Sequence, residues 1–307
     1  MANHSLRLLQ ERIDSIIKGK QNAVKMAIVT LLGRGHLLIE DVPGVGKTTL
    51  AFTLAKATNC SFQRIQFTSD MLPSDIIGVS IYNHDTKNFE FKQGPIFANI
   101  VLADEINRTS PKTQSALLEA MNERRVSADR KTYTLPEPFM VIATQNPIEY
   151  HGTFPLPESQ IDRFMMHLKL GYPETGYEKQ ALLGQSSLEF LEKMKPVITG
   201  DEILRIQKEV DNVRVDDSLL DYLMAIITET RRNEKIRLGA STRGAQFFLK
   251  AAKANAYYEG RDYVVPEDIK DLATTVLGHR LILKARTSIY DAEGIIKEIL
   301  ENIPVPV

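Results

Sequence analysis

The sequence predicts a three-layer α/β domain with a parallel sheet, followed by a small all-α domain. Short apolar runs alternate with helical stretches as far as Gly171, as in parallel sheets covered by helices. After Gly171 only helical patterns follow. The length of 307 residues predicts about two domains of roughly 150 residues each. The hydrophobic content of 43% is ordinary for globular domains that bury a core. We expect one domain over residues 1–175 and the other over residues 176–307.

The elements of the first domain follow from hydrophobic spacing. Leu6, Leu9, Ile13 and Ile16 recur at helical intervals, so we expect an amphipathic helix that ends near Gly19. Further helices are expected at residues 21–32, 48–58, 112–123 and 158–164. Short apolar runs predict buried strands at residues 36–40, 61–67, 99–104 and 139–144.

Two segments, residues 76–93 and 125–135, interrupt this alternation. Each contains two short β-type runs around a polar turn, which predicts a hairpin. A hairpin of this kind is either an ordinary surface excursion or a contact site for a partner. The residues alone leave both interpretations open.

The second domain carries clear helix-start signals. Thr199 and Glu202 have the spacing of a capping box, so we expect a helix from there to about Val210. A further helix is expected over residues 218–230. Ser241 or Thr242 caps the next one, which ends before residue 260, and a proline at 266 is expected to begin the last long helix.

Composition argues against several kinds of protein. The net charge of −1 argues against a nucleic-acid-binding protein, which normally has a strong basic excess. The single cysteine, Cys60, permits no intrachain disulfide, and the six histidines have no metal-ligand spacing. No apolar run approaches the roughly 18 residues of a membrane span, and the first residues lack a signal-peptide pattern. We expect a cytoplasmic protein without membrane insertion.

A phosphate-binding loop is predicted at residues 41–48 (DVPGVGKT), between a strand and a helix. Gly44 and Gly46 let backbone N–H groups approach phosphates, and the helix N-terminus adds partial positive charge. Lys47 is expected to reach the β- and γ-phosphates, and the Thr48 hydroxyl to bind Mg²⁺. Asp41 stands where the motif has its first glycine, which leaves the entry turn in question.

Polar groups at the ends of two later strands complete a candidate hydrolytic site. Asp104 and Glu105 end an apolar strand, 57 residues after Lys47. We assign Asp104 to the Mg²⁺ shell and Glu105 to the general base that activates water. Asn146 follows the next strand and could orient that water, although an Asn-Pro pair is equally typical of a turn.

Two arginines, Arg163 and Arg243, are further candidates. An isolated arginine is usually a solvated or salt-bridged surface group. The functional alternative is a cation that neutralises charge on the γ-phosphate during hydrolysis. Spacing and composition alone do not favour this alternative.

The chain resembles the MoxR family of AAA+ ATPases, which are P-loop NTPases, over nearly its whole length. Five stretches carry the resemblance: residues 40–48 (EDVPGVGKT), 102–108 (LADEINR), 114–121 (QSALLEAM), 143–147 (ATQNP) and 152–158 (GTFPLPE). Each could occur by chance, but the set in this order is highly specific. The family's loop commonly opens with an acidic pair, so the resemblance explains Asp41 as a family trait.

The resemblance implies roles that periodicity does not. Asn146 matches the sensor-1 position, Arg243 the sensor-2 position, and Arg163 the arginine finger that acts on a neighbouring subunit's nucleotide. Gly19 lies in the segment near the adenine. The implied ATP-binding residues are therefore Gly19, Pro43, Gly44, Val45, Gly46, Lys47, Thr48 and Thr49.

Three further properties follow from the resemblance. The two hairpins match the helix-2 insert and the hairpin before sensor 1, and the helical domain matches the lid. Such proteins form homo-oligomers, as hexameric rings, that use Mg²⁺ and ATP to mature or remodel a client protein. A von Willebrand factor A domain protein is often the partner.

Two rival functions remain open. Related AAA+ branches with the same inserts are DNA-remodelling motors, although the near-neutral charge argues against one here. The other rival is a nucleotide-gated interaction module without turnover. The presence of Glu105, Asn146 and Arg163 argues against that module.

Overall fold

A five-stranded parallel sheet forms the centre of the computed structural model, which describes residues 2–129, 131–147, 153–172, 176, 194–284 and 289–306. The strand order is β2-β5-β8-β1-β9, and all neighbours are parallel. The strands are β1 (Leu37–Glu40), β2 (Phe62–Gln66), β5 (Ile100–Asp104), β8 (Met140–Gln145) and β9 (Met166–Leu168). Their carboxyl ends therefore meet at one edge of the sheet.

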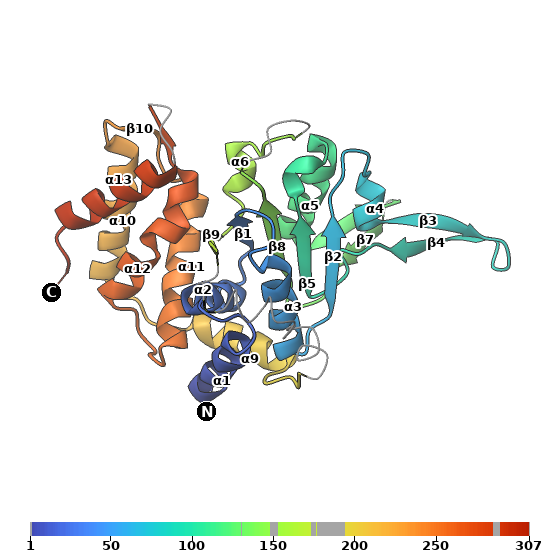
Figure 1. The fold of residues 1–307 in the computed structure, drawn as a ribbon, viewed down its shortest axis with the longest axis horizontal. Coiled ribbons are helices and arrows are strands. Elements are labelled where there is room, and N and C mark those ends of the chain that lie inside the picture. Colours follow the sequence, from blue (N-terminus) through green and yellow to red (C-terminus); the bar gives the residue numbers. More distant parts are fainter. Residues whose placement is uncertain are drawn as a thin grey trace.

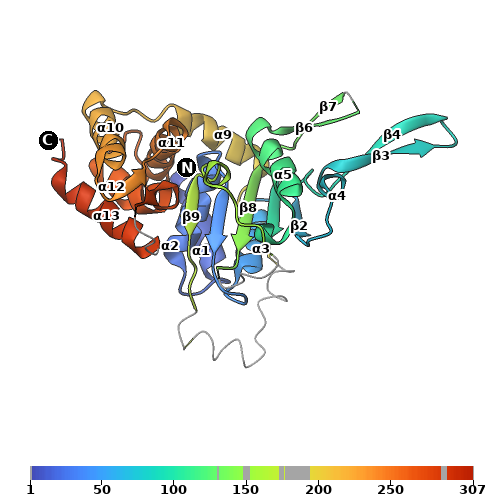
Figure 2. The ribbon, with the colours of Figure 1, turned by 90° about the horizontal axis from the view of Figure 1, so that it is seen from above.

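Helices cover both faces of this sheet (Figures 1 and 2). On β1, Leu37 and Ile39 pack into one hydrophobic core and Leu38 into the other, as period-two alternation requires. The first core includes α1 (Ala2–Asp14), α2 (Gln21–Leu32) and α3 (Lys47–Ala57). The second includes α4 (Pro73–Ile77) and α5 (Pro111–Glu123). The three-layer α/β prediction is confirmed.

The sheet contains one strand that the sequence did not predict. β9 pairs with β1 at the sheet edge, although it has only three residues. The helix predicted for residues 158–164 is shorter than expected, because α6 covers only Glu158–Ile161. The first helix also ends earlier than predicted, because α1 stops at Asp14 and not near Gly19. The other predicted helices and strands of this domain are confirmed within one or two residues at their ends.

Both predicted hairpins are present and project from the same side of the domain (Figure 2). One pairs β3 (Gly78–Asn83) with β4 (Asn88–Gln93), and the other pairs β6 (Arg125–Ala128) with β7 (Lys131–Thr134). Phe91 and Tyr133 stack with ring centroids 4.2 Å apart, so an aromatic contact joins the hairpins.

The C-terminal part is mainly helical and lies on the opposite side of the sheet from the hairpins (Figure 1). Its helices are α9 (Gly200–Asp211), α10 (Asp217–Arg232), α11 (Thr242–Tyr258), α12 (Pro266–Leu277) and α13 (Ile289–Asn302). The capping box at Thr199 and Glu202 is confirmed, and Ser241, not Thr242, caps α11. The predicted domain boundary lies outside the described residues.

Two features of this part differ from the sequence prediction. β10 (Ile236–Leu238) and β11 (Ile282–Leu283) form a small antiparallel sheet between the helices. The helix at Pro266 is not the last one, because α13 follows it. Two- and three-residue strands are too short to show an alternating pattern.

None of the helices that the structure describes is long and apolar enough to span a membrane.

Candidate active site

A cavity of about 370 Å³ lies at the carboxyl edge of the sheet. It is lined by Pro43, Gly44, Gly46, Lys47, Thr48, Thr49, Arg64, Gln66, Asp104, Glu105 and Asn146. Nine of these are residues that the sequence singled out, and they come from three separate segments. The parallel sheet brings them together because it ends β1, β5 and β8 at the same edge.

The loop between β1 and α3 has the backbone of a phosphate cradle. Gly44 and Gly46 have φ values of 86° and 95°, in the left-handed region that favours glycine. A Cβ built on either glycine meets no atom within 4 Å, so both face open space. The Val45 side chain instead packs into the core, and only its backbone is available for a ligand.

Asp41 anchors the entrance to this loop. Its carboxylate accepts hydrogen bonds from the backbone N–H of Val42 (2.8 Å) and of Gly171 (2.6 Å). Its carbonyl accepts from Lys47 Nζ at 2.6 Å. A glycine could supply only the last contact. Asp41 therefore fastens the loop to the segment after β9, which settles the question raised by the missing glycine.

The segment around Gly19 contacts the same region of the chain. Lys20 Nζ donates a hydrogen bond of 2.7 Å to the carbonyl of Tyr172, next to Gly171. Gly19 itself has a φ of 75° and does not line the cavity. The structure thus brings the α1–α2 junction beside the anchor of the phosphate loop without placing Gly19 in the site.

Thr144 organises the acid pair. Its hydroxyl donates to Asp104 Oδ1 (2.6 Å) and accepts from the backbone N–H of Glu105 (2.9 Å). Asp104 is 8% exposed, and Glu105 has a left-handed φ of 57°. Such a conformation costs a non-glycine residue about 1 kcal/mol or more. It turns the chain directly after the strand, so that both carboxylates line the cavity.

Two cavity residues, Arg64 and Gln66, were missed from the sequence. Arg64 Nη2 lies 2.6 Å from Asp104 Oδ2, and Gln66 Nε2 donates to Glu105 Oε2 at 2.7 Å. Both stand on β2, which pairs with β5 so that Gln66 lies opposite Asp104 and Arg64 opposite Leu102. Their period-two spacing on a strand was the available signal, because polar residues two apart share one face.

The electrostatics of the cavity match a polyanion with a divalent cation. Burial lowers the pKa of Lys47, and the carboxylates of Asp104, Asp41 and Glu105 oppose that shift. Among the described residues, no three His, Cys, Asp or Glu side chains lie close enough to hold a metal ion. Mg²⁺ bound to Thr48 and Asp104 would therefore take its other ligands from phosphate and water oxygens, as Mg²⁺ commonly does. The residues present fit both groups.

The two candidate arginines lie together, but outside this cavity. Arg163 Nη1 donates to the Leu118 carbonyl at 2.9 Å, and burial and the Arg243 charge lower the pKa of Arg163. Arg163 Nε is buried and has no hydrogen-bond partner in the described part of the chain. Arg243 lies 3.7 Å from Asp162, with its side chain 44% exposed. Asn146, by contrast, is buried inside the cavity lining.

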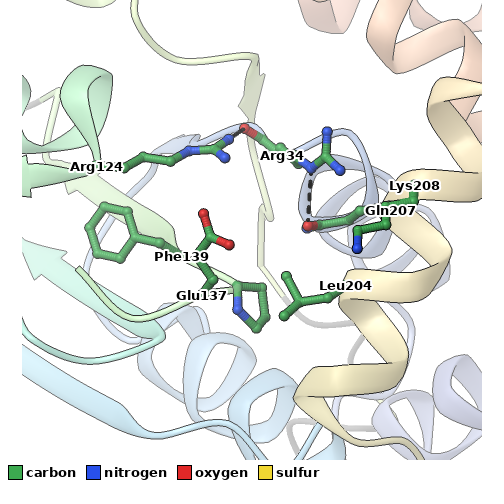
Figure 3. Close-up of a pocket in the computed structure, with 8 residues that line it drawn as sticks. Arg34, Arg124, Glu137, Phe139, Leu204, Gln207 and Lys208 are labelled. Carbon is green, nitrogen blue, oxygen red and sulfur yellow. Dashed lines mark hydrogen bonds between the residues drawn. The ribbon is translucent and has the colours of Figure 1, made fainter. Parts of the chain in front are cut away.

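A second cavity of about 180 Å³ lies near the start of β8, between the sheet domain and α9 (Figure 3). It is lined by Arg34, Arg124, Glu137, Pro138, Phe139, Leu204, Gln207 and Lys208. Arg34 binds Asp211 at 2.6 Å and Gln207 at 3.2 Å. None of the residues predicted to be functional lies in it.

Sequence comparisons agree with this architecture. Residues 36–166 match the family described as "ATPase family associated with various cellular activities (AAA)", and residues 228–299 match the AAA lid domain. Chaperone MoxR1 of Mycobacterium tuberculosis is 39% identical over 99% of this chain and 83% of its own length. The uncharacterised protein YeaC of Bacillus subtilis is 50% identical over 97% of this chain and 93% of its own.

A solved structure and a more distant relative support the same assignment. A crystal structure from Cytophaga hutchinsonii, whose protein is provisionally described as an ATPase, has a TM-score of 0.87 and 39% identity. The match covers 100% of this chain and 98% of that one. Protein MoxR of Methylorubrum extorquens is 26% identical over 97% of this chain and 94% of its own length. With its phosphate loop, acid pair and lid, the chain belongs to the MoxR family of AAA+ ATPases.

Proposed function

We propose that this protein hydrolyses ATP with Mg²⁺ and uses the reaction to remodel or mature a client protein. One observation carries the proposal: a glycine cradle, Lys47 and two carboxylates line the same cavity at the carboxyl edge of the sheet. These are the groups that phosphoryl transfer to water requires. The chaperone MoxR1 from M. tuberculosis, which aligns with 99% of this chain, supports the chaperone role.

Each cavity residue has a distinct task in this proposal. The N–H groups of residues 44–49 and the Lys47 ammonium hold the phosphates. Thr48 and Asp104 hold Mg²⁺, which supplies neutralising charge at the phosphate oxygens when bound. Glu105 takes the proton of the attacking water, and Asn146 orients that water.

Gly19, Pro43 and Val45 complete the proposed ATP site. Pro43 lines the cavity, and Val45 offers its backbone N–H. Gly19 is assigned to the adenine side, beside the segment that Asp41 anchors. The loop conformation at Gly44 and Gly46 supports this arrangement, since each glycine leaves room for a phosphate where a side chain would otherwise stand.

The remaining charge neutralisation is assigned to a neighbouring subunit. Arg163 does not line its own chain's cavity, so a finger role requires a second copy. We therefore propose a homo-oligomer, as a hexameric ring, in which Arg163 of one subunit completes the next subunit's site. Arg243 senses the nucleotide from the lid, for which we propose residues 176–307, with residues 1–175 as the nucleotide-binding core.

The client is proposed to be a protein, contacted by the exposed hairpins. Phe89 and Val79 on the β3–β4 hairpin are 71% and 50% exposed. Exposed apolar side chains on a projecting element are typical of protein contact surfaces. A von Willebrand factor A domain protein in the cytoplasm is the partner class we propose first.

Turnover and its metal dependence test the first part of the proposal. The purified protein should release phosphate from ATP with Mg²⁺ and stop when EDTA is added. Lys47→Ala should abolish turnover. Phosphate release that persists at the parent rate in Lys47→Ala would contradict the site. Stimulation by DNA that weakens with salt would favour the DNA-motor alternative.

Mixing two inactive variants tests the shared site. Arg163→Ala keeps an intact ATP site but offers no finger, whereas Lys47→Ala offers a finger but has no working ATP site. Turnover should reappear in the mixed oligomer and should peak near equal proportions. If both variants assemble and the mixture stays inactive, Arg163 does not act between subunits.

A Glu105→Gln trap identifies the client. This variant should bind ATP without turning it over, and so hold the client-bound state. A von Willebrand factor A domain protein retained with ATP, but not without it, would support the proposed partner class. Retention that does not depend on nucleotide would speak against coupling.

A further inference from the structure

A buried arginine from the C-terminal part holds the segment that carries Arg163. Arg280 lies in a short 3₁₀ turn after α12, and its side chain is only 1% exposed. Its Nη2 donates to the carbonyls of Phe164 (2.5 Å) and Asp162 (3.3 Å), and its Nε to Asp162 Oδ1 (3.0 Å). One guanidinium therefore binds the two residues that flank Arg163 in the sequence, Asp162 and Phe164.

The start of α11, which also belongs to the C-terminal part, binds Asp162 as well. Ser241 Oγ lies 3.0 and 2.9 Å from the two carboxylate oxygens of Asp162, and Arg243 Nη1 lies 3.7 Å away. Ser241 caps α11, and Arg243 is the second residue of that helix. The carboxylate beside Arg163 is therefore held by three groups of the C-terminal part, one of which is Arg243 itself.

The packing around Arg280 leaves its side chain little room to move. A Cβ added to Gly244 of α11 would lie 2.8 Å from Arg280 Cδ, so this position accommodates the arginine only as glycine. Burial lowers the pKa of Arg280 to about 10, so the guanidinium stays charged at neutral pH. A buried cation of this kind is costly without its carboxylate. Separation of the Asp162–Arg280 ion pair is therefore strongly unfavourable.

Arg163 has few contacts of its own. The described structure gives its guanidinium a single acceptor, the Leu118 carbonyl, and leaves Nε unpaired. Its direction is therefore set largely by the backbone of residues 162–164. Arg280 binds carbonyls of that backbone, and Ser241 binds the side chain of Asp162. The Asp162 joint, meaning Asp162 with Ser241, Arg243 and Arg280, connects that backbone to the lid.

We propose that Asp162 is a positioning residue that fixes Arg163 relative to Arg243 within one subunit. A lid movement that follows the nucleotide in a subunit's own site then moves the arginine offered to the next site. The inference rests on the proposed function, because it assumes that Arg163 acts between subunits. The proposed function assigns separate roles to Arg163 and Arg243. The inference adds that Asp162 connects the two arginines physically.

The test measures finger donation separately from ATP hydrolysis in the same subunit. Arg163→Ala subunits serve as acceptors, with an intact ATP site and no finger. Lys47→Ala subunits serve as donors, with a finger and no working ATP site. Adding Asp162→Asn to the donor should lower the turnover of the mixture about ten- to hundredfold, because small displacements of a catalytic group have effects of that size.

Matched controls separate positioning from folding. A Lys47→Ala donor that carries Asp271→Asn, the same chemical change at an exposed position of α12, should support the full mixed turnover. The Asp162→Asn single variant should bind ATP within about twofold of the parent, because the joint lies outside the cavity. Asp162→Glu, which keeps the charge for Arg280, should donate better than Asp162→Asn.

A milder variant covers the case in which Asp162→Asn fails to assemble. Ser241→Ala removes one lid contact to Asp162 and leaves the Arg280 pair in place. It also removes the cap of α11, so Asp216→Ala, which removes the cap of α10, is its control. In donors, Ser241→Ala should lower mixed turnover severalfold, and Asp216→Ala should not.

Two outcomes would overturn the inference, and they are distinguishable. Full turnover with assembled Asp162→Asn donors would show that the joint does not position Arg163, and would leave the proposed function intact. No turnover in the reference mixture of Arg163→Ala and Lys47→Ala would instead refute the action between subunits. The inference would then fail together with that part of the proposed function.

Discussion

The two ends of the parallel sheet both gather charged side chains, but they use them differently. At the carboxyl end, Lys47, Asp104 and Glu105 line one cavity with two glycines that face open space. At the amino end, Arg34 forms an ion pair with Asp211. Arg34 also donates to Gln207, and Arg124 donates to the Arg34 carbonyl (Figure 3). The carboxyl-end arrangement leaves room for a ligand. The amino-end arrangement connects α9 to the sheet domain.

Backbone conformation differs between the two ends in the same way. At the amino end, Arg34 and Arg124 have left-handed φ values of 54° and 51°, within two residues of the ends of α2 and α5. Such residues commonly end helices. At the carboxyl end, Glu105 has a left-handed φ directly after a strand and turns toward the cavity. The comparison teaches that a left-handed, charged residue indicates a site only when its side chain faces the cavity that other functional groups share.

The same substitution at each end gives the largest predicted contrast. Glu105→Gln should lower ATP turnover by about 10²–10⁴-fold, because the amide cannot accept the proton of water. Glu137→Gln, in the amino-end cavity, should leave turnover within about twofold. Phosphate release under saturating ATP measures both. A similar loss in the two variants would mean that the ends are not functionally distinct.

Acid should destabilise the amino end through His36. Its Nδ1 accepts from the Val141 N–H, and its Nε2 lies 3.0 Å from the Met121 carbonyl, so the neutral ring satisfies both partners. Burial lowers the pKa of His36 to about 4. As pH falls from about 6.5 to 4, the unfolded chain takes the proton first, and we expect a loss on the order of 3 kcal/mol.

Urea unfolding of the parent and of His36→Gln measures this loss. Well above pH 6.5, His36 is neutral in both the folded and the unfolded state, so the free energy of unfolding should not change with pH on account of this residue. Carboxylates also titrate at low pH, so the quantity of interest is the difference between the two proteins at pH 7 and pH 4.5. An unchanged difference would show that His36 is accessible to protons in the folded state.

Lysine substitutions compare the two cavities for ATP affinity. Lys47→Met should weaken ATP binding about ten- to hundredfold, the range expected for hydrogen bonds to a charged group. Lys208→Met, at the amino-end cavity, should change it by less than about twofold. Equilibrium titration with a fluorescent ATP analogue distinguishes them. Equal weakening would place nucleotide contacts at both ends.

The smallest predicted effect concerns the strained helix end at Arg34. Arg34→Ala and Arg34→Gly both remove the contacts to Asp211 and Gln207, but only glycine adopts the left-handed conformation without strain. We expect Arg34→Gly to be more stable than Arg34→Ala by about 1 kcal/mol. Thermal unfolding of the two variants provides the comparison, and a more stable alanine variant would show that the turn relaxes.

Much of the carboxyl end was predictable because its signals are local. The phosphate loop needs glycines and a lysine at set positions between a strand and a helix, and residues 41–48 contain all of them. The acid pair and Asn146 follow apolar runs, so their places at strand ends were predictable too. Parallel strands end at one edge, and this rule explains why one cavity contains these residues.

The short strands and the last helix were harder to predict from sequence. β9 has three residues, and its strand conformation depends on hydrogen bonds to β1. β10 and β11 depend on each other in the same way. Pairing between distant segments leaves no periodic pattern in so short a run.

By itself the sequence determined the layer order, the phosphate loop, the acid pair and the family resemblance, because each depends on residues close together in the chain. Only the tertiary structure showed that Asp41 binds Gly171, that Arg64 binds Asp104, and that Arg280 holds Asp162. These contacts join residues 130, 40 and 118 positions apart. A contact at such separation is specified by the packing of whole elements, which no local pattern records.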